Sequence, residues 1–150
     1  MMKIYLAGSL FNEAEIKQRK WEGQRMREAF PEADVCNPID QPFNENKESL
    51  PAPQTIYNSD IKSIRSCDVF VADLTNEDPG VMLALGIAIE AKVPHVIGVN
   101  SDSRMTCANQ YDIPSYGMNH FVLGAVLENG ILVSSFEKAV IKIKEIMNKK

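Results

Sequence analysis

Two aspartates are candidates for acid–base chemistry, because a carboxyl group that faces a cleft can donate or accept a proton. Asp60 lies four residues after Ile56 and four before Ile64, so a helix would align it with apolar side chains. Burying it there is costly unless the carboxylate is paired, for example with a lysine, or serves a cleft. Asp78 precedes Pro79, a pair typical of a helix start, so it could be a cap, a cleft residue or both.

Three other polar residues lie within or close to predicted elements. Tyr5 alternates with Ile4 and Leu6 and is either a packed aromatic residue with a satisfied hydroxyl or a site residue. Ser9 follows the same predicted strand and is either a turn residue or a hydroxyl that faces a ligand. Gln41 lies in a proline-flanked segment and has no distinguishing context of its own.

The sequence carries no motif for a dinucleotide, a triphosphate or a metal. Gly8 belongs neither to a GxGxxG pattern nor to a Walker loop. His95 and His120 lie far apart and lack the spacing of metal ligands. We therefore expect neither a metal nor a cofactor.

The elements that must position these residues alternate along the chain. Apolar runs predict strands at 3–7, 34–37, 68–73, 95–99 and 131–133. Helices are predicted from the Asn12–Glu15 capping box to Phe30, at 54–66, 79–91 and 118–126, and after a second capping box formed by Ser134 and Glu137. Residues 38–53 are interpreted as a long surface loop.

This alternation predicts a single α/β domain over residues 1–150, flavodoxin-like or Rossmann-like, with a five-stranded, mostly parallel sheet and helices on both faces. Ligands bind such sheets at the carboxyl ends of the strands. Those ends fall at residues 8–9, 37–41 and 73–78. The polar candidates therefore gather where this fold would place a site.

Composition limits the other possibilities. The chain has 150 residues, 45% of them apolar, and a formal charge of −4, which argues against nucleic acid as the main partner. The sequence shows neither a membrane-spanning run nor the pattern of a signal peptide. Its three cysteines form no CxxC pair. We expect a soluble, cytoplasmic protein with reduced thiols.

The predicted helix at 79–91 carries the most informative motif. Gly80, Leu85 and Gly86 match the pattern Gly-x-x-x-Glu-Leu-Gly, and the glutamate position is occupied by Ala84. The segment resembles the nucleoside 2-deoxyribosyltransferase family, in which this glutamate is catalytic. Without that resemblance, Ala84 would be an ordinary residue of a tightly packed helix.

Further positions match the family in order over about residues 3–133. Residues 4–8 followed by Phe11 resemble the family's first strand and loop, whose tyrosine lies beside the nucleophile. Gln41 falls where the family has a glutamine that contacts the nucleobase. Asp60 and Asp78 match its two aspartates on the base side, and Asn119 matches an asparagine that reaches the sugar in a neighbouring subunit's site.

The resemblance implies transfer of a 2-deoxyribosyl group between nucleobases with retention, through a covalent glycosyl-enzyme. The glutamate would be the nucleophile, Tyr5 would orient it, and Asp60 and Asp78 would bind the base and move its proton. The implied substrate-binding positions are Ser9, Phe11, Gln41, Gly80 and, from a neighbour, Asn119. The implied partners are 2-deoxyribonucleosides, free nucleobases and further copies of the chain, at least as a dimer and up to a hexamer, without a membrane or nucleic acid.

Ala84 cannot attack the sugar, because a methyl group has no lone pair. The chain is then either a deliberate Glu→Ala variant, which we favour because the other site positions are intact, or a natural member that only binds or senses nucleosides. Two alternative functions stay open. A nucleoside monophosphate N-glycosidase would need a phosphate pocket, yet residues 8–12 contain no basic residue. A non-catalytic nucleoside-binding module would need no nucleophile.

Overall fold

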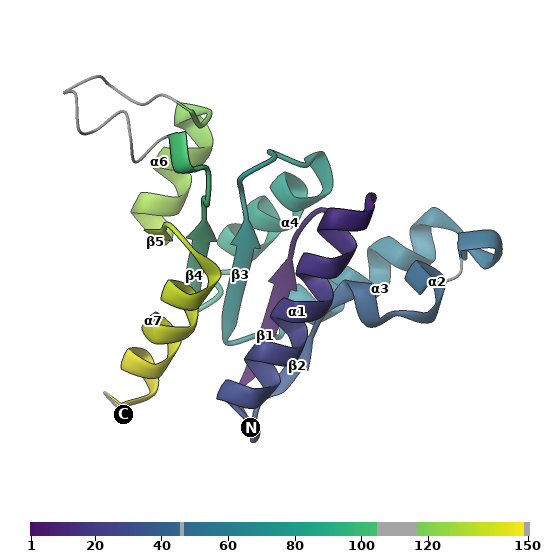
Figure 1. The fold of residues 1–150 in the computed structure, drawn as a ribbon, viewed down its shortest axis with the longest axis horizontal. Coiled ribbons are helices and arrows are strands. Elements are labelled where there is room, and N and C mark those ends of the chain that lie inside the picture. Colours follow the sequence, from purple (N-terminus) through teal and green to yellow (C-terminus); the bar gives the residue numbers. More distant parts are fainter. Residues whose placement is uncertain (46, 105–116, 149–150) are drawn as a thin grey trace.

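A single parallel sheet organises the chain. The computed structural model describes residues 1–45, 47–104 and 117–148 (Figure 1). The sheet has five strands in the order β2-β1-β3-β4-β5, and every pairing is parallel. The strands are β1 (Lys3–Ala7), β2 (Asp34–Cys36), β3 (Val69–Asp73), β4 (His95–Val99) and β5 (Gly130–Val133). The predicted α/β architecture is confirmed, and the sheet is wholly parallel in the described residues.

Helices cover both faces of the sheet. One face packs against α1 (Glu13–Ala29) and α7 (Phe136–Asn148), which stand in front of the strands in Figure 1. The other face packs against α3 (Pro53–Arg65), α4 (Pro79–Glu90) and α6 (His120–Asn129). Strand residues alternate between the two cores: Ile4 and Leu6 face α1 and α7, whereas Tyr5 and Ala7 face α3 and α4.

Residues 38–53 are more ordered than the predicted loop. They form two short 3-10 helices, Pro38–Asp40 and Lys47–Ser49, around the short helix α2 (Pro42–Glu45). Proline at the start of a turn presets the backbone torsion and needs no amide donor there, so the prolines that suggested a loop begin short helices. This correction matters because the segment forms one wall of a pocket.

The predicted start of the last helix is also corrected. The amide of Lys138 donates to Ser135 Oγ at 3.2 Å, so the capping serine is Ser135 and not Ser134. Glu137 is paired with Arg25 at 2.7 Å and closes no capping box. By contrast, the first cap is confirmed, because Asn12 Oδ1 accepts a hydrogen bond from the Glu15 amide at 3.0 Å.

The junction between α6 and β5 is shorter than the gap predicted between the helix at 118–126 and the strand at 131–133. α6 extends to Asn129, and β5 begins at the next residue, Gly130. A Cβ at position 130 would lie 2.0 Å from the Val96 carbonyl oxygen, so only glycine allows the strand to pair so closely after the helix.

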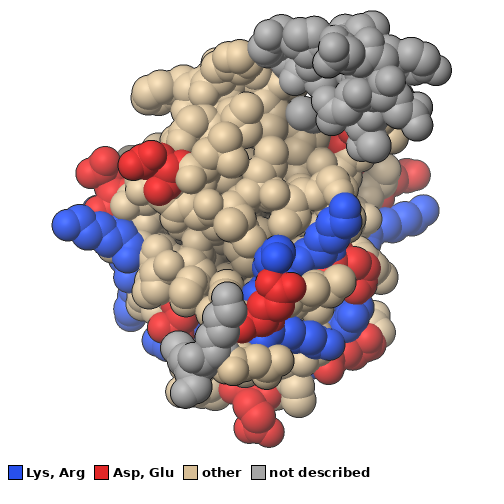
Figure 2. Space-filling view, turned by 90° about the vertical axis from the view of Figure 1, so that its left-hand side faces the viewer, with Lys and Arg blue, Asp and Glu red and all other residues tan. Residues whose placement is uncertain are grey.

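Charged side chains are unevenly distributed on the surface. Figure 2 shows the side of the molecule that carries α6, where lysines, arginines and carboxylates gather low on the face and are sparse above. α6 itself exposes Phe121 (88%) and Leu127 (60%). No helix in the described part of the chain has the length and apolar character needed to cross a membrane.

Candidate functional site

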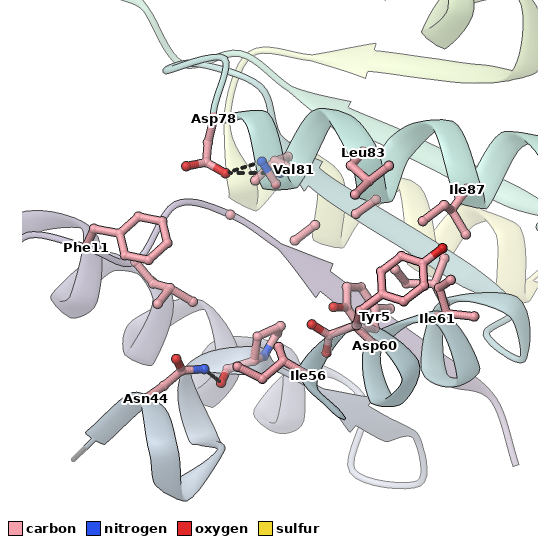
Figure 3. Close-up of a pocket in the computed structure, with 18 of the residues that line it drawn as sticks. Tyr5, Phe11, Asn44, Ile56, Asp60, Ile61, Asp78, Val81, Leu83 and Ile87 are labelled. Carbon is pink, nitrogen blue, oxygen red and sulfur yellow. Dashed lines mark hydrogen bonds between the residues drawn. The ribbon is translucent and has the colours of Figure 1, made fainter. Parts of the chain in front are cut away.

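A pocket of about 500 Å³ opens beside the carboxyl end of β1. It lies between α4 on one side and the 3-10 helix Pro38–Asp40, α2 and α3 on the other (Figure 3). We call it the α3–α4 pocket. The walls are mostly apolar, and the polar side chains among them come from β1, α2, α3 and the start of α4. Its lining includes Tyr5, Gly8, Phe11, Pro38, Phe43, Asn44, Leu50, Ile56, Tyr57, Asp60, Ile61, Asp78, Gly80, Leu83, Ala84 and Ile87.

The fold brings four of the sequence candidates together in this pocket. Tyr5 comes from β1, Asp60 from the middle of α3, Asp78 from the cap of α4 and Ala84 from its second turn. Phe11 and Gly80 also line it. Strand end, helix face and helix cap converge because β1 lies beside β3, whose following helix α4 packs against α3.

Tyr5 and Asp60 interact at the base of the pocket, where Figure 3 places them next to each other. The Tyr5 ring stacks on Phe70 with centroids 5.8 Å apart, which fixes the direction of its hydroxyl. Burial, together with the charge of Asp60, raises the pKa of Tyr5 far above its ordinary value. The hydroxyl therefore stays protonated and donates to the carboxylate.

Asp60 keeps its carboxylate at the pocket without a cationic partner in the described part of the chain. Partial burial raises its pKa, and the hydrogen bond from Tyr5 opposes that rise only in part. The lysine pairing considered from the sequence is not seen among these residues. A carboxyl group with a raised pKa is suited to proton transfer.

Asp78 performs the capping role that its sequence position predicts. Its Oδ1 accepts from the amides of Gly80 at 2.9 Å and Val81 at 3.1 Å. Figure 3 shows the second carboxylate oxygen turned away from these amides at the pocket wall. One oxygen thus holds the start of α4, and the other is available to a ligand.

Ala84 lies on the face of α4 that closes the pocket and is only 9% exposed. It also packs in the core cluster that contains Tyr5 and Phe70. Its neighbour Leu83 is 57% exposed and lines the pocket rim. Position 84 therefore presents a methyl group near the Tyr5–Asp60 pair, where a longer side chain would project into the pocket.

Three sequence candidates lie outside this pocket. Ser9 Oγ donates to Glu15 Oε2 at 2.9 Å and so is bound at the start of α1. Gln41 uses its backbone in the turn before α2, donating to the Pro38 carbonyl at 3.1 Å. Asn119 caps α6, where its Oδ1 accepts from the Phe121 amide at 2.9 Å. The backbone amide of Asn119 donates to Glu77 Oε1 at 2.8 Å.

Sequence reasoning missed the apolar wall opposite α4. Phe43, Leu50 and Tyr57 line the pocket, and Leu50 and Tyr57 are at least half exposed. Large apolar residues in an otherwise polar segment were a usable signal, because exposed apolar patches commonly mark binding sites. Asn44, three residues after Gln41, also lines the pocket and was not singled out.

The pocket's electrostatic character is acidic. Of the described residues that line it, none is a lysine, arginine or histidine, and two are aspartates. Within the described ranges, no cluster of three side chains could hold a metal ion. The arrangement can accept hydrogen bonds and exchange protons with an uncharged or cationic ligand.

Comparisons with known proteins agree with this architecture. An uncharacterised protein of Ureaplasma parvum serovar 3 is 33% identical over 115 residues, which cover 69% of this chain and 73% of that protein. A conserved protein of Enterococcus faecalis has a similar structure, with a TM-score of 0.79 and 25% identity over 97% of this chain and 98% of that one.

Two more distant structures share the fold. A 2-deoxyribosyltransferase from Bacillus psychrosaccharolyticus superposes with a TM-score of 0.64 and 15% identity, covering 92% of this chain and 90% of that chain. A CMP N-glycosidase from Clostridium botulinum gives 0.57 and 16%, covering 95% and 98%. The family model described as nucleoside 2-deoxyribosyltransferase matches residues 4–140, nearly the whole sheet and its helices. The chain therefore belongs to the nucleoside 2-deoxyribosyltransferase family.

Proposed function

We propose that the α3–α4 pocket binds a 2-deoxyribonucleoside for transfer of its sugar between nucleobases, and that Ala84 limits this chain to binding. The observation that carries the proposal is the convergence of Tyr5, Asp60, Asp78 and position 84 on one cavity. A retaining transfer needs a nucleophile near the anomeric carbon and a proton donor near the base. Asp60 and Asp78 support the second requirement, and position 84 would be the place of the nucleophile.

With glutamate at position 84, the steps would balance as a double displacement. A carboxylate oxygen would form a bond to C1′ while the bond from C1′ to the base breaks, and a carboxyl group, Asp60 or Asp78, would protonate the departing base. A second base would then attack C1′, returning the electron pair to the carboxylate and its proton to the aspartate. Two inversions give retention. Tyr5 would orient the nucleophile once its single hydroxyl proton turns from Asp60 to the glutamate carboxylate.

An alternative hydrolytic function on nucleoside monophosphates has less support. A phosphate carries up to two negative charges and is normally met by arginine, lysine or a row of backbone amides. The described lining lacks a basic side chain and carries two aspartates, which would repel that group. This charge distribution favours an uncharged nucleoside as the ligand.

We also propose that a second copy of the chain completes the site. Asn119 does not line the pocket of its own chain, so its proposed role on the sugar requires a neighbour. Phe121, two residues later in α6, is 88% exposed and offers apolar surface to a second copy. Light scattering is expected to give at least a dimer, and a monomer would remove the role proposed for Asn119.

The decisive experiment compares this chain with Ala84→Glu and with Ala84→Gln, a control of matched size that lacks a nucleophilic carboxylate. Each protein is incubated with deoxyinosine plus adenine and, separately, with thymidine plus cytosine, and chromatography follows the exchanged nucleoside and the free base. Exchange by Ala84→Glu alone supports the transferase. Release of base without exchange favours hydrolysis. If all three bind deoxynucleosides without reaction, the chain is a binding module.

A further inference from the structure

The polar atoms that the α3–α4 pocket offers to a ligand are mostly hydrogen-bond acceptors. Asp78 has one carboxylate oxygen left after capping α4, and Asp60 presents a carboxylate. The described lining contains no cationic donor. Its two tyrosine hydroxyls are that of Tyr5, which is engaged by Asp60, and that of Tyr57 on the half-exposed α3 wall. A ligand with N–H donors would satisfy these oxygens. The carbonyl oxygens of a ligand would instead face these acceptors with no hydrogen atom to share.

Asn44 adds a fixed acceptor on the far side of the cavity from Tyr5. Its side-chain nitrogen donates to the Pro38 carbonyl at 2.6 Å, and its backbone amide donates to the Gln41 carbonyl at 2.8 Å. These two bonds hold the side chain in one orientation. Figure 3 shows the amide oxygen turned toward the open space between Phe11 and Ile56. The oxygen is therefore presented to the ligand and not consumed within the protein.

The layout of the pocket separates its sugar end from its base end. Position 84 and Tyr5 mark the end where C1′ would lie under the proposed function, and Asn44 lies across the cavity near Phe11. A base extending from C1′ would place its exocyclic substituent toward Asn44. An amino group there donates to Asn44 Oδ1, whereas an oxo group places two acceptors against each other.

We propose that the pocket selects nucleosides whose base carries an exocyclic amino group, as in adenine and cytosine, over their oxo counterparts, with Asn44 Oδ1 as the specificity-determining acceptor. The inference rests on the proposed function, because it assumes that a nucleoside occupies this pocket. It assigns to Asn44 a role that the family resemblance implied for Gln41, which is not part of the lining.

The present chain is suited to the test, because without a nucleophile it can be titrated at equilibrium. Isothermal titration calorimetry would compare two matched pairs, deoxyadenosine with deoxyinosine and deoxycytidine with deoxyuridine. We expect the amino nucleoside of each pair to bind about tenfold more tightly, the effect of one buried hydrogen bond gained against one lost. Asn44→Leu should bring both ratios close to one, mainly by weakening the amino nucleosides.

Two controls separate recognition from folding. Asn44→Asp keeps an acceptor oxygen at the same position and should retain the amino preference. Both Asn44→Asp and Asn44→Leu remove the side-chain donor to the Pro38 carbonyl, so a preference that depended only on this structural contact would be lost in both variants. Asn58→Leu removes an exposed asparagine of α3 that does not line the pocket and should leave both ratios unchanged.

The outcomes distinguish this inference from the proposed function. If all four nucleosides bind but the amino and oxo forms bind equally, or if the preference survives Asn44→Leu, the assignment to Asn44 is wrong and nucleoside binding stands. If none of the four binds to the parent chain, the proposed function fails and the base preference fails with it.

Discussion

The two faces of the sheet at β1 differ in how their charged side chains are compensated, although both groups of charges lie near the carboxyl ends of the strands. On the α1 side, Arg19, Glu22 and Asp73 form a closed ion cluster. Arg19 Nη2 donates to Glu22 Oε1 at 3.0 Å and to Asp73 Oδ2 at 2.7 Å. On the α4 side, Asp60 and Asp78 line a cavity of about 500 Å³ with no cation in its described lining.

The difference separates charges that are compensated within the fold from charges that we propose serve a ligand. Arg19 and Glu22 are 3% and 5% exposed, so each charge must be compensated inside the protein. Among the described residues, Asp60 is compensated by the Tyr5 hydroxyl alone, which leaves part of its desolvation cost in place. Gly8 lies between the two regions, since it lines the cavity and leaves room for the Arg19 guanidinium behind it.

The largest effect is expected from breaking the ion cluster. Arg19→Met would leave the carboxylates of Glu22 and Asp73 buried without their cation, and we expect a loss of about 3–5 kcal/mol in the free energy of unfolding. Urea denaturation would measure it. Arg25→Met is the matched control on the same helix, because its partner Glu137 is 47% exposed at the side chain. Its loss should stay below about 1 kcal/mol, and equal losses would contradict the distinction.

Glu22 gives the cluster a pH dependence. Burial, only partly offset by Arg19, raises its pKa from 4.5 to about 7. A raised folded-state pKa contributes stability below the unfolded value, which is lost as the pH rises through 7. We expect the free energy of unfolding to fall by roughly 2–3 kcal/mol between pH 5 and pH 8.

The variant Glu22→Gln should remove most of that decline when unfolding is measured across the same range. Asp73 does not obscure the result, because Arg19 and Thr75 lower its pKa and its contribution is lost only as the pH falls through the acid range. A slope that persists in Glu22→Gln would assign the pH dependence to another group.

Gly8→Ala tests the contact between the two regions. A Cβ at this position would lie 1.6 Å from Arg19 Nη1, so the guanidinium must shift from its carboxylate partners. We expect a loss of about 1–3 kcal/mol, typical of overpacking. Gly86→Ala is the matched control in the middle of α4, where a Cβ meets nothing within 4 Å. It should gain about 0.5–1 kcal/mol from helix propensity in the same denaturation assay.

The sequence was sufficient to predict the fold and most of its strands and longer helices. Alternation placed Tyr5 on the opposite face of β1 from Ile4 and Leu6, helical spacing placed Asp60 beside apolar residues, and the pair with Pro79 placed Asp78 at a cap. Each of these is a local pattern with a fixed period or offset. The structure preserves the predicted side-chain directions where a neighbouring element supplies apolar side chains for them to pack against.

The sequence did not reveal contacts between distant segments. Arg19 and Glu22 look like the solvated face of α1, yet Asp73, 54 residues after Arg19, draws them inward. Asn44 has no local signal, because its role depends on the Pro38 carbonyl and on the wall of α4 opposite. Ser9 seemed free to face a ligand until Glu15 proved to bind it. Such pairings depend on tertiary geometry, which no short window of sequence contains.

The smallest change in the free energy of unfolding is expected when Asp60 is substituted, and the sign of that change is the informative result. Because burial raises the pKa of Asp60 above its ordinary value, ionisation costs stability at neutral pH. Asp60→Asn should therefore increase the free energy of unfolding at pH 7 by about 1 kcal/mol, and the gain should vanish as the pH falls below about 4, where the parent carboxyl is protonated.

Asp68→Asn is the control for removing one negative charge. The carboxylate of Asp68 accepts an exposed hydrogen bond from the Lys3 backbone amide at 2.8 Å, so its substitution should not stabilise the chain. Thermal unfolding at pH 7 and pH 4 would compare the two variants. If Asp60→Asn is destabilising at pH 7, Asp60 supports the fold as Asp73 does, and the contrast between the two sides of β1 fails. If it is stabilising, this carboxylate is retained at a cost to stability, which is the expected property of a residue kept for its ligand.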